Sequence, residues 1–253
     1  MTILTASTTN EASVRPVLRL GLLGVGNVGQ GVIDVLTRNG GEIERRAGQA
    51  IRVVAASRRN VAALKALADA GVRTTDDPGA VVRDPEVDVV VELIGGTTLA
   101  KQLVLEAISL GKHVVTANKA LLAEHGTEIF AAAQKAGVIV AFEAAVAGGI
   151  PIIKALREGL TANHIEWVAG IINGTTNFIL SEMRDKGLDF DTVLKEAQRL
   201  GYAEADPTFD IEGVDAAHKL ALISAIAFGV PVQFHKAHVQ GITGLASEDI
   251  RYA

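Results

Sequence analysis

The stretch from Leu18 to Gly29, LRLGLLGVGNVG, decides how this chain folds. Its first half is an apolar run typical of a buried strand, and its second half has the GxGxxG spacing of a loop that opens a helix. Such glycines permit a tight turn, a close approach of the backbone to a pyrophosphate, and close packing of the helix on the strand. The free N–H groups at the helix start favour phosphate. The stretch therefore predicts a dinucleotide site with contacts from Gly24, Gly26, Asn27, Val28 and Gly29.

Apolar strands and helical patterns alternate on the C-terminal side of this loop. We expect strands at residues 18–23, 51–56, 87–93, 113–116 and 138–142, and helices at residues 28–39, 61–70, 99–110 and 121–136. Strands that are nearly continuous Val, Ile and Leu runs are covered on both faces, as in a parallel α/β sheet. The pattern predicts a Rossmann-type doubly wound parallel sheet over residues 16–147, after a loose leader at residues 1–15.

The regular alternation of predicted strands and helices ends at Gly148-Gly149-Ile150-Pro151. A helix at residues 152–158 and an apolar strand at residues 165–172 precede helices at residues 175–186, 189–200 and 214–228. This order no longer resembles successive βαβ units. We therefore expect a domain boundary near Gly148 and a smaller α+β substrate-binding and dimerisation domain over residues 148–253.

The composition excludes several classes of protein. The net charge is −5 among 253 residues, so the positive footprint of a nucleic-acid-binding protein is missing. There is no cysteine, hence no disulfide framework and no thiolate nucleophile. No apolar run reaches the roughly 18 residues of a membrane helix, and the first residues lack the basic start of a secretory signal. We expect a soluble, cytoplasmic protein with no nucleic-acid or membrane partner.

The second predicted strand ends in Ala-Ser-Arg58-Arg59-Asn, without the acid that usually holds the ribose of NAD. Two arginines suit a 2′-phosphate and so favour NADP, with NAD as the alternative; a solvated basic turn is the other interpretation. Gly95 and Thr97 follow the third predicted parallel strand, and Thr116 and Lys119 follow the next. Because ligands bind at the carboxyl ends of parallel strands, we assign these residues to the cofactor site as well.

The segment from residue 197 to residue 219 carries five carboxylates ahead of Lys219. Asp215 and Lys219 lie four residues apart on a predicted helix and so share a face. Their helix is apolar nearly all round, which indicates burial, and buried charges are costly unless they are paired or used. The spacing therefore favours a functional Asp–Lys pair over a surface salt bridge.

The segment from residue 197 to residue 219 resembles a motif of a known family. The motif made of Ala197, Gly201-Tyr202-Ala203, Asp206-Pro207, Asp210-Ile211, Gly213, Asp215 and Lys219 is similar to the diagnostic pattern of homoserine dehydrogenases. The segments NGTTNFI at residues 173–179 and TANK at residues 116–119 also resemble that family. The resemblance runs from about Val17 to the end of the chain. It implies interconversion of L-homoserine and L-aspartate 4-semialdehyde on the route to threonine, methionine and isoleucine.

The resemblance also implies roles for individual residues. Lys219 resembles the catalytic proton-transfer residue, with Asp215 beside it and Lys119 facing the reacting centre. Substrate binding is implied for Glu204, Asp210, Gly174, Thr175 and Tyr202, and a cofactor contact for Gly201. A monovalent cation site, with sodium as its expected occupant, is implied for Glu143, Val146, Gly148 and Ile150. Family members usually form dimers through the second domain, so we expect a homodimer.

Two alternatives to a homoserine dehydrogenase remain open, and a third is disfavoured. Family members continue past Ala253, so we expect the second domain to be incomplete and a truncated NADP-binding module without turnover to be one alternative. Assignment to a related NADP-linked oxidoreductase with another substrate accounts equally well for the dinucleotide-binding half of the chain. It does not account for the motif that ends at Lys219. A divalent-metal hydrolase is disfavoured because the six histidines are scattered without recognisable ligand spacing.

Overall fold

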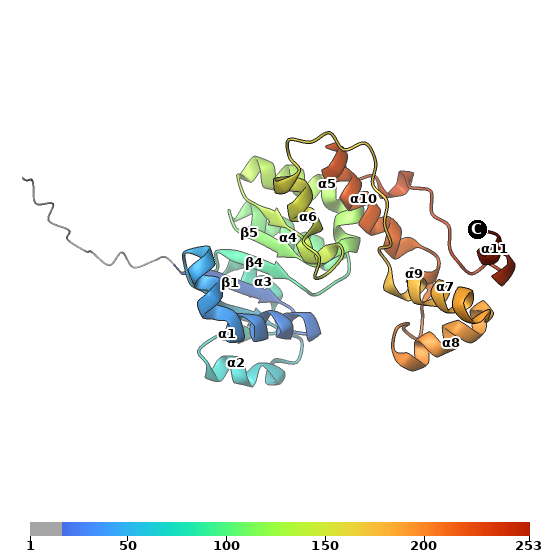
Figure 1. Cartoon of the computed structure of the whole chain (residues 1–253). Helices are drawn as coiled ribbons and strands as arrows, with labels where there is room; N and C mark the ends of the chain where they lie inside the picture. The colour runs from blue at the N-terminus through green and yellow to red at the C-terminus, as the bar shows by residue number, and fades with distance from the viewer. Residues whose placement is uncertain (1–16) are drawn as a thin grey trace, which may run out of the picture. The chain divides into compact units, whose positions relative to one another are not determined.

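A computed structural model describes residues 17–253, so the predicted leader at residues 1–15 lies outside the described residues. The chain divides into two compact units, one ending at Val90 and the other spanning residues 91–253 (Figure 1). This division falls inside a strand, whereas the predicted domain boundary lies between residues 147 and 148. That boundary stays a prediction. Among residues 17–253, no helix combines the length and the apolar character needed to cross a membrane.

Six strands form one sheet in the order β3-β2-β1-β4-β5-β6, and the pairs β1–β2, β2–β3 and β5–β6 are parallel. The strands are β1 (Leu18–Leu23), β2 (Ile51–Ser57), β3 (Arg73–Thr75), β4 (Val89–Glu92), β5 (His113–Thr116) and β6 (Val140–Ala141). The strand order reverses at β1, as in doubly wound nucleotide-binding folds. The predicted fold class is confirmed. The short strand β3 was not predicted, because three residues are too few to show a periodic pattern.

The first unit is built around β1 and β2, and it also contains α1 (Asn27–Ala47), the 3-10 helix η1 (Val61–Leu64), α2 (Lys65–Asp69) and α3 (Pro78–Arg83). Leu22 and Leu23 are fully buried, which explains why the apolar run forms a central strand. Gly21 lets α3 and the segment before β4 approach closely, since a Cβ there would lie 2.7 Å from Val81 Cγ1 and 2.9 Å from Val87 Cγ1. Close packing at Gly21 therefore depends on the missing side chain.

The second unit begins with the other half of the sheet. Helices α4 (Thr98–Ser109) and α5 (Lys119–Ala136) alternate with β5 and β6, and the 3-10 helix η2 (Glu143–Ala145) follows. α4 and α5 pack against each other, and α5 also packs against α10 (Val214–Phe228). The fully buried side chains Leu121, Leu122 and Ile129 form the inner face of α5. This packing fixes the start of α5 at the carboxyl end of β5.

The rest of the second unit is helical. Its elements are α6 (Ile152–Lys154), a π-helical turn η3 (Ala155–Gly159), α7 (Gly174–Lys186), α8 (Phe190–Leu200), α9 (Thr208–Ile211), the 3-10 helix η4 (Phe234–Lys236) and α11 (Ser247–Tyr252). A small core of Ile179, Met183, Val193, Ala197 and Ile211 joins α7, α8 and α9. Figure 1 shows these helices grouped in orange, with α10 running between them and α5.

The prediction of a strand over residues 165–172 is wrong. This segment has no helix or strand, because a strand needs a hydrogen-bonded neighbour and none of the described residues pairs with it. Val168 and Ile172 instead line an apolar hollow of about 580 Å³ beside α10. Trp167 and Ile171 are 73% and 80% exposed. The apolar side chains that predicted a strand therefore line the hollow, in the case of Val168 and Ile172, or are exposed, in the case of Trp167 and Ile171.

Replacing Gly21 by valine tests the packing around β1. The new side chain would overlap Val81 and Val87, so we expect the free energy of unfolding to fall by about 1–3 kcal/mol in urea titrations. Gly31→Ala is the matched control, since nothing lies within 4 Å of a Cβ at this position in α1. Alanine is the better helix former there, and we expect a gain of up to about 1 kcal/mol. Equal stability of the Gly21→Val protein and the original chain would contradict this description of the core.

Candidate active site

The predicted Asp215–Lys219 pair lies on α10, which begins after Gly213. Gly213 adopts a left-handed conformation with φ 81°, and the helix places Asp215 in its first turn, where the helix dipole favours a carboxylate. Asp215 is only 3% exposed. The Lys219 ammonium lies 2.5 Å from Asp215 Oδ2 and donates a second hydrogen bond to the Ile172 carbonyl at 2.7 Å. Asp215 is therefore buried and Lys219 partly buried, with two hydrogen bonds from its ammonium group, so the pair is not a surface salt bridge.

Lys119 approaches the same carboxylate from another element. Its Nζ lies 3.0 Å from Asp215 Oδ1, so each oxygen of Asp215 faces one ammonium group. Lys119 is the first residue of α5, where the helix dipole disfavours a cation. Asn118 caps this helix by accepting a hydrogen bond from the Leu121 N–H at 3.1 Å. The position of Lys119 is thus explained by Asp215 and not by the stability of its own helix.

Asn173, for which the sequence predicted no individual role, completes the cluster. Its Nδ2 donates hydrogen bonds to Asp210 Oδ1 at 2.7 Å and to Asp215 Oδ2 at 2.8 Å. Its Oδ1 accepts from the Thr176 N–H at 2.8 Å and caps α7. An asparagine ahead of a helical pattern is a recognisable capping signal. The two carboxylates that its amide joins, 37 and 42 residues away, leave no such signal.

The charges around Asp215 determine its protonation. Burial is the largest single influence and by itself would raise the pKa of Asp215. The hydrogen bonds from Lys219, Asn173 and Lys119 together outweigh burial, and the pKa of Asp215 lies below its ordinary value. The group is therefore an anion at neutral pH, and it compensates two cations that a low-dielectric site would otherwise disfavour.

Aromatic rings border the cluster on the side of Lys119. The Lys119 ammonium lies 5.6 Å from the centre of the Phe209 ring, within the range of a cation–π interaction. His218, one residue before Lys219, is 3% exposed and lies edge-on between Phe209 and Phe234, with ring centres 5.3 Å and 4.3 Å away. Its Nδ1 is buried with no hydrogen-bond partner. Burial therefore lowers the pKa of His218, Lys119 lowers it further, and Glu124 and Asp215 only partly oppose this.

A second buried carboxylate, Glu92, ends β4. It is 0% exposed, and its Oε1 accepts hydrogen bonds from the N–H groups of Ile94 and Gly95 at 3.0 and 3.1 Å. Its Oε2 accepts from the Thr116 hydroxyl at 2.6 Å. The predicted cofactor residues Gly95 and Thr116 are thus joined by a residue that the sequence analysis missed. An acid at the end of a buried strand, three residues before a glycine pair, is the signal that could have found it.

The glycine loop belongs to the first unit. Gly24 has φ 93°, and its N–H donates to the Ser57 carbonyl at 3.0 Å, so the turn follows β1 directly. Gly26 precedes α1, which has no side-chain cap and no acid in its first turn. A Cβ at Gly26 would meet nothing within 4 Å and would fill open space at the helix start. Arg58 and Arg59, at the end of β2, are both exposed. Oxygen atoms of a phosphate fit this set of free donors.

The remaining predicted substrate residues lie at the start of α7 and after α8. The Thr175 hydroxyl donates to the Tyr202 carbonyl at 2.7 Å, which joins these two segments. Gly174 is the first residue of α7, and Gly201 ends α8 in a left-handed conformation with φ 79°. Glu204 is exposed, and its carbonyl accepts a hydrogen bond from Gln198 at 3.1 Å. Asp210 reaches the cluster through Asn173, whereas Glu204 lies on the exposed loop between α8 and α9.

Two family models match the chain over most of its length. The model described as "Homoserine dehydrogenase, NAD binding domain" matches residues 24–143, and the model described as "Homoserine dehydrogenase" matches residues 151–253. The homoserine dehydrogenase of Pseudomonas aeruginosa is 62% identical over 243 residues, which are 95% of this chain and 55% of that protein.

The chain belongs to the homoserine dehydrogenase family.

Solved structures agree with this assignment. A homoserine dehydrogenase from Thiobacillus denitrificans has a TM-score of 0.89 and 67% sequence identity, over 94% of this chain and 55% of that one. A hyperthermophilic archaeal homoserine dehydrogenase in complex with NADPH has a TM-score of 0.76 and 25% identity, over 92% of this chain and 76% of that one. The chain spans about half the length of the curated relatives it matches.

The loop that the family resemblance assigns to a monovalent cation follows η2. Both oxygens of Glu143 accept hydrogen bonds from the start of α6, from Ile153 N–H at 2.9 Å and Lys154 N–H at 3.0 Å. Ala147 is the one non-glycine residue with positive φ, 48°, in the described part of the chain. Val146 is fully buried, whereas Ile150 is 61% exposed. Among the described residues, no group of three or more His, Cys, Asp or Glu side chains could hold a metal ion.

The buried His218 predicts how stability depends on pH. Because the pKa of His218 is lowered in the folded chain, the unfolded chain binds the proton first. The stability contributed by neutral His218 is therefore complete above the ordinary histidine pKa of 6.5 and is lost as the pH falls below it. We expect His218→Leu to lose less stability than the original chain between neutral and mildly acidic pH. At neutral pH its free energy of unfolding should change by less than about 1.5 kcal/mol.

Urea unfolding at a series of pH values measures this difference. His164 is exposed, so His164→Leu serves as the matched control and should keep the pH dependence of the original chain. If His218→Leu and the original chain lose the same free energy of unfolding on acidification, His218 does not govern this part of the profile.

Proposed function

We propose that this chain catalyses the NADP-linked interconversion of L-homoserine and L-aspartate 4-semialdehyde. The observation that carries the proposal is the buried Asp215 carboxylate shared by Lys119 and Lys219, in a member of the homoserine dehydrogenase family. Two ammonium groups held beside an anion can stabilise and protonate a developing alkoxide, which is what reduction of an aldehyde requires.

Lys219 is the proton-transfer residue in this proposal. A lysine ammonium has three N–H donors, and two of them are directed at Ile172 and Asp215. The third donor is available for the substrate oxygen. In the reducing direction Lys219 gives a proton to the aldehyde oxygen, and in the oxidising direction it takes the hydroxyl proton of homoserine. Bound NADPH would supply the hydride.

Asp215 and Lys119 prepare the site for this transfer. Asp215 keeps the Lys219 ammonium in one orientation, and the low pKa of the carboxyl group means that it stays an anion throughout. Lys119 lies on the other oxygen of Asp215 and adds a second positive charge, which stabilises negative charge on the reacting oxygen. Asn173 and the Ile172 carbonyl restrict how far these groups can move.

The amino-acid part of the substrate carries an ammonium and a carboxylate. We assign the ammonium to Asp210 and Glu204, because carboxylates form charge-assisted hydrogen bonds with it. Gly174, Thr175 and Tyr202 complete the substrate site, and the Thr175–Tyr202 hydrogen bond supports their common placement. A charged receptor of this kind favours an amino-acid alcohol over a neutral sugar or a simple aldehyde.

The glycine loop is assigned to the cofactor. The free N–H groups at the start of α1 would bind the pyrophosphate, and the open space over Gly26 leaves room for the phosphate. Arg58 and Arg59 would bind the 2′-phosphate of NADP, which NAD lacks. The further cofactor contacts in this proposal are Asn27, Val28, Gly29, Gly95, Thr97, Thr116, Lys119 and Gly201.

Three further assignments follow from the family. The turn containing Glu143, Val146, Gly148 and Ile150 offers backbone carbonyl oxygens, which suit a hard monovalent cation such as sodium. The exposed Trp167 and Ile171 support a homodimer through residues 148–253, since aromatic residues are enriched at interfaces. We also propose a role in threonine, methionine and isoleucine biosynthesis and a cytoplasmic location.

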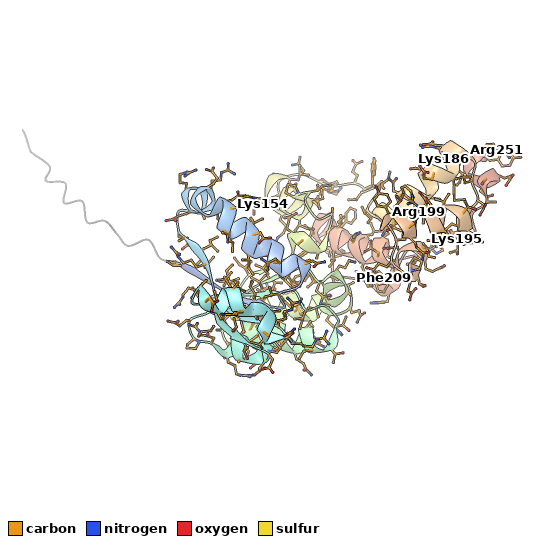
Figure 2. The ribbon with its side chains drawn as sticks, turned by 90° about the horizontal axis from the view of Figure 1, so that it is seen from below. Lys154, Lys186, Lys195, Arg199, Phe209 and Arg251 are labelled. Carbon is orange, nitrogen blue, oxygen red and sulfur yellow. The ribbon has the colours of Figure 1, made fainter. Side chains whose placement is uncertain are left out.

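Replacing Lys219 by alanine tests the catalytic assignment. Loss of the proton-transfer group should lower kcat for homoserine oxidation by about 10²–10⁴-fold, while the Kd for NADPH changes by less than about 3-fold. Lys195→Ala is the control, because Lys195 lies on the exposed surface of α8, near Lys186 and Arg199 (Figure 2). Turnover is followed as nicotinamide absorbance. Near-normal turnover of Lys219→Ala would remove this role, and NADPH binding without turnover in the original chain would favour a binding-only module.

Arg58 and Arg59 are tested by cofactor preference. The double variant Arg58→Ala, Arg59→Ala should raise KM for NADP by about 10²–10⁴-fold, because charge-assisted hydrogen bonds to the 2′-phosphate are worth about 1.5–3 kcal/mol each. KM for NAD should stay within about 2-fold. Arg38→Ala, on the exposed side of α1, is the control for lost positive charge. An equal rise in KM for both cofactors would show that these arginines do not bind the 2′-phosphate.

A further inference from the structure

Glu92 is a fully buried carboxylate to which the proposed reaction assigns no role. Both of its oxygens are acceptors: Oε1 for the N–H groups of Ile94 and Gly95, and Oε2 for the Thr116 hydroxyl. A buried carboxylate is costly unless its oxygens are satisfied, and here three donors from two different loops converge on it. Such an arrangement constrains the loops as much as it stabilises the acid.

The hydrogen bonds that Glu92 accepts belong to a ring of hydrogen bonds that joins the β4–α4 loop to the β5–α5 loop. The Thr116 hydroxyl that donates to Glu92 accepts from the Asn118 N–H at 2.9 Å. The Asn118 side chain then donates back to the Gly96 carbonyl at 2.7 Å. Gly95 and Gly96 have positive φ values of 74° and 71°, a conformation that glycine adopts readily and other residues rarely.

The ring ends next to the catalytic cluster. Asn118 caps α5, and the following residue is Lys119, whose ammonium lies 3.0 Å from Asp215. A displacement of the β5–α5 loop would therefore move Lys119 relative to the carboxylate. Glu92 lies outside this cluster, and its influence on it passes through Thr116 and Asn118.

We propose that Glu92 is a positioning residue that couples the two loops, so that the backbone at residues 94–97 and the Lys119 side chain adopt one common geometry. This inference rests on the proposed function, which assigns both loops to the cofactor. The direction of the hydrogen bond between Thr116 and Glu92 is the reason that a carboxylate is needed at position 92. The Thr116 hydroxyl has a single hydrogen, which it donates to Glu92 while its oxygen accepts from Asn118, and only an acceptor at Oε2 can receive that hydrogen.

Glu92→Gln separates this role from simple space filling. Glutamine keeps the size and one acceptor oxygen, which can still serve Ile94 and Gly95. Its NH₂ group would face the Thr116 hydroxyl as a donor, so the Thr116 hydrogen loses its acceptor and the link between the loops is weakened, while the first loop stays bonded. The matched control is Glu128→Gln, which removes the same charge from the exposed Lys101–Glu128 pair on α4 and α5.

The first readout is the Kd for NADPH, measured by nicotinamide fluorescence, together with kcat and KM for homoserine. We expect Glu92→Gln to raise the Kd for NADPH by roughly 10-fold and to lower kcat by a similar factor, because loops that contact the cofactor and Lys119 are no longer aligned. KM for homoserine should stay within about 2-fold, and Glu128→Gln should match the original chain.

The outcomes distinguish this inference from the function on which it rests. If the original chain binds no NADPH, the proposed function fails, and this inference fails with it. If the original chain binds NADPH and folded Glu92→Gln binds it equally well, only the positioning role is overturned; a lower melting temperature with unchanged Kd would indicate a purely structural carboxylate. If Glu92→Gln does not fold, Thr116→Val decides by the same Kd, since it removes the link and leaves Glu92 bonded to Ile94 and Gly95.

Discussion

The Asp215 carboxylate holds together segments that are far apart in the sequence. It receives Lys219 from its own helix, Lys119 from the start of α5, and the amide of Asn173 from the start of α7. A buried anion is stable only when donors surround it, and each of these donors is in turn a group that would be costly to bury alone. The requirement for mutual compensation therefore fixes where α5, α7 and α10 meet.

This constraint explains several local features that are otherwise unfavourable. A lysine at the first position of α5 opposes the helix dipole, but Asp215 compensates it. An asparagine before α7 caps that helix with its oxygen and bonds two carboxylates with its nitrogen. The cation–π contact of Lys119 with Phe209 then brings α9 to the same place. Local structure and the candidate site thus depend on the same few polar atoms.

Glu92 is a parallel case at the edge of the sheet. Asp215 organises side-chain ammonium groups, whereas Glu92 organises backbone N–H groups and one hydroxyl. The first arrangement suits chemistry at a substrate oxygen, and the second suits loops that must keep a defined shape near a ligand. Both are buried acids with every oxygen engaged, and together they link the carboxyl end of β4 to α10 through Thr116, Asn118 and Lys119.

The sequence alone determined the Rossmann-type sheet, from the alternation of apolar strands with helical patterns, and also the glycine loop and the face shared by Asp215 and Lys219, from spacing within a short segment. The residues 18–29 and the apolar helix at Val214–Phe228 carry these signals locally. The tertiary structure decided what depends on distant partners: the sharing of Asp215 by Lys119 and Lys219, the two bonds of Asn173, and the burial of Glu92. It also decided that residues 165–172 form no strand, because an apolar pattern along the chain cannot show whether a neighbouring strand is present to form hydrogen bonds with it.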